Sequence, residues 1–139
     1  MSGEGAVTPR QVELVKETWR AVVPIRDTFA QLFYGKVFDL DPTLRALFKG
    51  DLREQGRNFV AMVSIAVRHL HQSDKVLQGL RELGQRHVRY GVREQHYLTL
   101  GTALILTLDV SLGEAFTPEA RAAWEKAYEL VSRSMTAPC

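Results

Sequence analysis

The stretch "DPTLRALF" (residues 41–48) contains the local signal on which the fold class depends. Asp41 offers a side-chain oxygen that can cap a helix. Pro42 suits the first helical position, because the N–H that proline lacks would have no partner there. The same pairing of an oxygen-bearing cap with proline recurs at Thr8-Pro9 and Thr117-Pro118. The sequence has no Asn-Gly or Asp-Gly turn and no sustained alternation of apolar and polar residues, so we predict an all-α protein.

Apolar residues at three- and four-residue spacings outline about seven helices. Pro24 should end or kink the first of them, and Gly91 should stop the fifth. No internal repeat or low-complexity segment interrupts this pattern. Helices are expected to begin at Pro9, at Pro42, after the Gly50-Asp51 turn and at Pro118, and the apolar residues that mark the helices lie within about 12–22, 29–39, 42–48, 59–70, 76–87, 97–108 and 124–135.

The composition is that of one soluble globular domain, with 139 residues, 45% hydrophobic residues and a net charge of +2. We expect residues 1–8 and 136–139 to be frayed tails. The arginines are scattered singly, which argues against nucleic acid binding, and the single cysteine, Cys139, permits no internal disulfide. Residues 1–8 lack the features of a signal peptide, and the broken apolar run 97–110 is too short to span a bilayer. We therefore expect a cytoplasmic protein without a membrane segment.

A search for catalytic motifs finds no ordinary enzyme site. There is no G-x-S-x-G motif, no glycine-rich phosphate loop and no cysteine–histidine cluster, and no two histidines lie four residues apart on a helix. A porphyrin site survives this search, because a porphyrin supplies four nitrogen ligands and needs one imidazole from the protein. His87, in the stretch "LGQRHVRYGV" (83–92), could supply it. It could equally be a cation at a helix end, and the residues alone leave both interpretations open.

Six stretches together resemble a globin, in particular a bacterial single-domain globin of the flavohaemoglobin-related class, and are similar to the Hell's Gate type. They follow the family's order over nearly the whole chain. The stretches are "LVKETW" (14–19), "LFYGKVF" (32–38), "DPTLRALF" (41–48), "LGQRHVRYGV" (83–92), "HYLTLG" (96–101) and "AAWEKAYELV" (122–131). The resemblance implies a globin fold around a haem b pocket.

The resemblance also implies roles for individual residues. His87 would be the proximal iron ligand, Tyr34 and Gln55 would donate hydrogen bonds to a bound gas, and Phe48 would wedge the haem. Tyr97 matches a tyrosine that polarises the proximal histidine in flavohaemoglobins, whereas the matching glutamate is missing near Cys139. Glu94 is a speculative substitute, and the carbonyl of Leu83 is the plainer partner. The slot would be lined by Phe38, Phe59, Val63, Leu83, Val92, Tyr97, Leu100, Leu104 and Val131, with Arg86 and, more weakly, Arg53 and Arg57 near the propionates.

The function that the resemblance implies is binding of O2, CO and NO, with O2 held tightly and released slowly. Nitric oxide dioxygenation is a further activity, for which an external reductase would be needed because the chain stops where a flavohaemoglobin would continue. A monomer or weak dimer is expected. Two alternatives stay open: a haem-based gas sensor or redox module, and a haem-free helical interaction domain.

Overall fold

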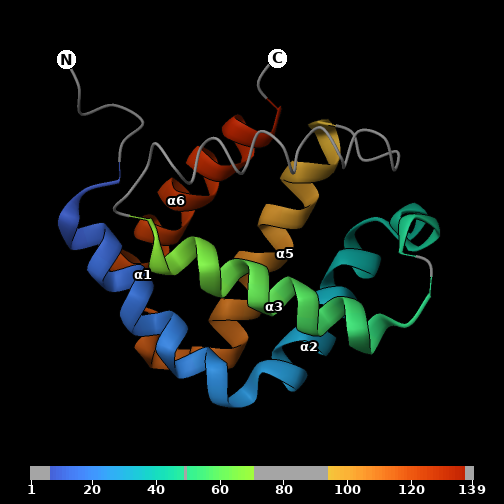
Figure 1. Cartoon of the computed structure of the whole chain (residues 1–139), viewed down its shortest axis with the longest axis horizontal. Coiled ribbons are helices and arrows are strands. Elements are labelled where there is room, and N and C mark those ends of the chain that lie inside the picture. Colours follow the sequence, from blue (N-terminus) through green and yellow to red (C-terminus); the bar gives the residue numbers. More distant parts are fainter. Residues whose placement is uncertain (1–6, 49, 71–93, 137–139) are drawn as a thin grey trace.

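The computed structural model describes residues 7–48, 50–70 and 94–136 (Figure 1). Within these ranges the chain forms α-helices and short 3₁₀ helices and contains no strand, which confirms the all-α prediction. The elements are α1 (Pro9–Val22), η1 (Val23–Ile25), α2 (Arg26–Leu40), η2 (Pro42–Leu47), α3 (Leu52–Arg68), α5 (Glu94–Leu112), η3 (Gly113–Ala115) and α6 (Pro118–Thr136).

The residues predicted to cap helices, Thr8, Asp41 and Thr117, do form capping hydrogen bonds in the structure. Thr8 and Gln11 form a reciprocal capping box, in which each side-chain oxygen accepts from the other residue's backbone N–H at 3.1 and 3.0 Å. The side-chain oxygens of Asp41 and Thr117 each accept from a backbone N–H of the following turn at 3.1 Å. Asp51, which the sequence suggested only as part of a turn, caps α3 in the same way at 2.9 Å.

The helix boundaries follow local signals in the sequence. Pro24 was predicted to end or kink the first helix, and α1 ends at Val22, where the 3₁₀ turn η1 that contains Pro24 joins it directly to α2. The long helix predicted after the Gly50-Asp51 turn begins at Leu52, because Asp51 satisfies its first free N–H groups. The short helix after Asp41 is a 3₁₀ helix rather than an α-helix.

The core forms where α2 packs against α3 and α5, and α1 packs against α6. In Figure 1, α3 crosses in front of α5 and α6 at a steep angle. Trp124 donates its indole N–H to the buried Thr18 hydroxyl at 2.7 Å, and Trp19 donates to Ser64 at 2.9 Å. Trp19 also meets the wholly buried Phe29 edge to face at 5.5 Å. These contacts fix α1 to α3 and α6 and so set the outer walls of the space between the helices.

Helix α5 lies in this core. Ala103, Thr107 and Leu108 are fully buried where it packs on α1, α2 and α6. Thr107 satisfies its hydroxyl on the Ala103 carbonyl at 2.7 Å. Among the residues that the structure describes, α5 with the turn after it is the one segment long and apolar enough to cross a membrane by length and composition. The apolar run that the sequence predicted to be too short to span a bilayer is therefore longer than expected, and 33% of it is buried within the protein.

Candidate functional site

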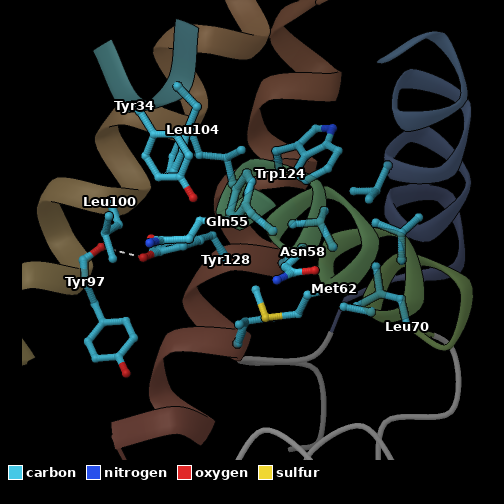
Figure 2. A pocket seen from close by; sticks show the side chains of 18 of the residues that line it. Tyr34, Gln55, Asn58, Met62, Leu70, Tyr97, Leu100, Leu104, Trp124 and Tyr128 are labelled. Atoms are coloured by element: carbon cyan, nitrogen blue, oxygen red, sulfur yellow. Dashed lines mark hydrogen bonds between the residues drawn. The ribbon is translucent and has the colours of Figure 1, made fainter. Parts of the chain in front are cut away.

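A cavity of about 380 Å³ lies between α2, α3, α5 and α6 (Figure 2). Most of its wall is aliphatic or aromatic, and the polar side chains on it come from few positions. Such a volume and such a wall are typical of sites for small molecules and cofactors. The described residues that line it are Val15, Phe33, Tyr34, Phe48, Gln55, Asn58, Phe59, Met62, Val63, Ala66, Val67, Leu70, Tyr97, Leu100, Leu104, Trp124, Ala127, Tyr128 and Val131.

Tyr34, on α2, presents a hydroxyl to this cavity (Figure 2). Its ring is 7% exposed and lies among Phe33, Phe38, Phe48 and Phe59, at centroid distances of 5.5, 6.2, 5.2 and 6.5 Å. No described residue forms a hydrogen bond with the hydroxyl. Burial raises the pKa of Tyr34 to about 12, so the phenol keeps its proton at neutral pH. The cavity therefore contains a fixed, neutral hydrogen-bond donor.

Helix α3 supplies the other polar groups. Gln55 and Asn58 both line the cavity, because residues three apart share one face of a helix. Gly56 determines how closely α3 approaches α2: a Cβ there would lie 2.9 Å from the Cβ of Ala30 and 3.6 Å from the Tyr34 ring. A larger residue at position 56 would push the two helices apart. Gly56 thus allows the Tyr34 and Gln55 side chains to reach one cavity.

The opposite wall contains a pair of tyrosines, Tyr97 and Tyr128. The Tyr128 hydroxyl on α6 donates to the backbone carbonyl of Tyr97 on α5 at 2.5 Å (Figure 2). Gly101 makes room for this ring, since a Cβ there would lie 2.8 Å from Cδ2 of Tyr128. Burial raises the pKa of both tyrosines, and for Tyr128 the neighbouring Tyr97 raises it further. Tyr128 thus ties the start of α5 to α6 at the edge of the cavity.

The structure brings together nine of the residues suggested by the sequence. Of the described residues that were predicted to line the haem slot, only Phe38 does not line the cavity. It lies one helical turn beyond Tyr34. Its ring instead stacks on Tyr34 and meets Phe48 edge to face at 5.7 Å. Arg53 and Arg57 line a separate cleft. The nine are Tyr34, Phe48, Gln55, Phe59, Val63, Tyr97, Leu100, Leu104 and Val131.

Several predictions concern residues that the structure does not describe. The proposed iron ligand His87 is among them. The others are Leu83, Arg86, Val92 and Cys139. In the described ranges no three His, Cys, Asp or Glu side chains gather at one point that could hold a metal ion.

The sequence reasoning missed several lining residues, of which Asn58, Met62 and Tyr128 are the most informative. Asn58 and Met62 follow Gln55 at helical spacings, so the periodicity of α3 could have placed them. Tyr128 carried no such signal, because it was assigned to a general apolar face of the last helix. Its role depends on Gly101, which lies on a different helix.

Comparison with known proteins matches residues 31–135 to a family model described as Globin. The chain belongs to the globin family. This globin is 26% identical to a neuroglobin of Tetraodon nigroviridis, over 94% of the chain and 91% of that protein. It is 28% identical to a neuroglobin of Danio rerio, over 88% and 86%. It is also 25% identical to a flavohemoprotein of Bacillus subtilis (strain 168), over 88% of the chain but 32% of that protein.

Family membership implies a haem cofactor and binding of small gas molecules by this globin. The described walls of the cavity fit such a group. Apolar side chains from facing helices would contact the faces of a flat macrocycle, and the Tyr34 hydroxyl, which faces the cavity, could donate to a polar ligand held there. The neighbouring polar wall, formed by Gln55 and Asn58, offers amide groups to the same space.

Proposed function

We propose that this globin holds haem b in the cavity between α2, α3, α5 and α6, with His87 as the iron ligand, and binds O2 tightly. We further propose that it is a bacterial single-domain globin of the flavohaemoglobin-related class, similar to the Hell's Gate type. The observation that supports tight binding is the Tyr34 side chain, whose ring is buried and whose hydroxyl faces the cavity without a hydrogen bond to any described residue. A donor that the described protein groups leave unengaged is available to a ligand.

When bound, haem would supply the iron at which a diatomic gas is taken up. The protein's part is to hold the macrocycle and to exclude water. Phe48 and Phe59 would contact it from the side of η2 and α3, and Leu100, Leu104 and Val131 from the side of α5 and α6. Contacts of this kind stabilise in proportion to the apolar area removed from water, at about 25 cal/mol per Å².

Tyr34 and Gln55 would set the gas affinity. A gas ligand that carried partial negative charge at this site would accept a hydrogen bond from a phenolic O–H or an amide N–H, which would stabilise its bound form. Hydrogen bonds to charged acceptors contribute about 1.5–3 kcal/mol, so one well-placed donor would slow O2 release roughly ten- to a hundredfold. Tight binding with slow release suits scavenging or redox chemistry better than delivery.

The same two residues favour one redox reaction over another. Peroxidase chemistry uses a base near the ligand, and neither a glutamine amide nor a phenol with a pKa of about 12 is a base near pH 7. Nitric oxide dioxygenation needs no such base, because NO and O2 with one electron give nitrate. The similarity to a flavohemoprotein supports this as a second activity. Sustained turnover would require an external reductase.

Absorption spectroscopy tests the proposal directly. The purified protein, reconstituted with haemin and compared before and after dithionite and CO, should bind haem with one protein ligand and give an open ferrous site. Gln55 supplies no imidazole there, so a low-spin ferrous spectrum before CO would refute the open site. A wild-type protein that stays colourless would refute haem binding altogether.

The dioxygenase activity has a separate readout. With a reductase and NADH present, nitrate formed per haem in repeated additions of NO should exceed one. A yield limited to one nitrate per haem under a continuous electron supply would leave gas binding intact and eliminate the enzymatic role.

A further inference from the structure

A second cleft, of about 540 Å³, opens between α2, η2 and α3. Among the described residues it shares a single lining residue, Tyr34, with the inner cavity, so the tyrosine ring separates the two spaces. The cleft is far more polar than the cavity. Its described lining consists of Asp27, Ala30, Gln31, Tyr34, Gly35, Phe38, Arg45, Leu52, Arg53 and Arg57.

Three arginines line the cleft from two directions. Arg53 and Arg57 lie one turn apart on α3, and Arg45 reaches the cleft from η2. The Arg45 guanidinium carbon lies 5.1 Å from the centre of the Phe38 ring, and this cation–π contact restrains where the charge sits. The described residues thus bring three positive charges together around one hollow.

These charges have no ion-pair partner among the residues that the structure describes. Asp27 is the one carboxylate in the described lining, and the described residues form no ion pair with any of the three arginines. Arg10 and Arg121, elsewhere on the surface, do pair with glutamates. Three guanidinium groups against one carboxylate leave the cleft with an excess of two positive charges.

We propose that this cleft binds a small anion with two or more neighbouring negative charges, carried by phosphate or carboxylate groups. A guanidinium offers N–H donors in a planar fork that matches both kinds of oxyanion, and such charge-assisted hydrogen bonds are stronger than neutral ones. Leu52 and Phe38 add apolar surface to the lining of the cleft. Apart from Tyr34, the described residues that line this cleft are not those that line the inner cavity.

Isothermal titration calorimetry on the full chain tests the proposal, with pyrophosphate as the phosphate probe, citrate as the carboxylate probe and acetate as a singly charged control. We expect binding of pyrophosphate or citrate, no detectable acetate binding, and affinity that weakens as NaCl is raised. The probe that binds more tightly identifies the oxyanion class. Failure of both at low ionic strength would overturn the proposal.

Substitutions locate the site. Arg45→Ala, Arg53→Ala and Arg57→Ala should each weaken binding roughly five- to thirtyfold. Arg68→Ala is the matched control, because Arg68 lies on α3 but outside the cleft, and it should change affinity less than twofold. Asp27→Asn should strengthen binding by removing the opposing charge. Equal losses in Arg68→Ala and the cleft variants, or no loss in any of them, would show that binding is nonspecific and refute the site.

Discussion

Replacing Tyr34 by phenylalanine separates the stability of this globin from its gas binding. The substitution removes one oxygen and leaves the ring among its four phenylalanine neighbours. Because no described residue accepts or donates a hydrogen bond at that hydroxyl, which faces the cavity, its removal orphans no polar group among the described residues. We therefore expect the free energy of unfolding to stay within about 1 kcal/mol of wild type. Loss of a donor worth about 1.5–3 kcal/mol should speed O2 release ten- to a hundredfold.

Stopped-flow displacement of O2 by CO measures the release rate, and urea denaturation of the same preparations measures stability. Tyr128→Phe is the matched control, since it removes a phenolic oxygen from the same cavity. That hydroxyl donates to the Tyr97 carbonyl, so its loss should cost about 1 kcal/mol of stability and leave the release rate within about twofold. If Tyr34→Phe releases O2 at the wild-type rate, the proposed donor role is wrong.

Further predictions concern protonation, packing and the iron ligand. Burial raises the pKa of Tyr34 to about 12 against about 10 when unfolded, so the unfolded chain loses this proton first. Stability should fall between pH 10 and 12, less steeply in Tyr34→Phe, as urea titrations at stepped pH would show. Gly101→Ala should lower stability by about 1–3 kcal/mol through overlap with Tyr128, whereas Gly35→Ala, with no atom within 4 Å, should be neutral or stabilising in thermal denaturation. His87→Ala should not retain haem through gel filtration, and retention with an unchanged spectrum would exclude it as the ligand.

The helical class and most helix starts could be predicted because their causes are local. Thr8, Asp41 and Thr117 cap helices through contacts within four residues, and such contacts can be read from adjacent letters. The start of α3 was predicted only as following the Gly50-Asp51 turn, because its first turn carries polar residues, Arg53 and Glu54 among them, and periodicity begins only where a face is buried. Periodicity therefore locates buried faces better than helix ends, which the caps locate.

Residues of the cavity wall were predicted where the resemblance to the globin family assigned them a role. The spacing of Tyr34, Gln55 and Phe59 identified positions that the structure indeed places on one cavity. Phe38 was assigned to the same wall, but it lies one helical turn further along α2 and lines the outer cleft instead. The contact of Tyr128 with Gly101 could not be anticipated, because it joins two helices whose register depends on the packing of the whole core.

The aromatic residues around Tyr34 explain how one hydroxyl can discriminate between gases. A donor stabilises a partly charged ligand only if its position is fixed before the ligand arrives, since reorientation would offset the gain. Phe33 stacks on Phe59 at 4.3 Å, and together with Phe38 and Phe48 they surround the Tyr34 ring, which is almost wholly buried. A ring enclosed in this way has few alternative rotamers. We expect the fixed hydroxyl to favour O2, which gathers negative charge, over CO, which gathers little. Phe38 would therefore influence gas binding from outside the cavity, by holding in place the residue that lies between the two spaces.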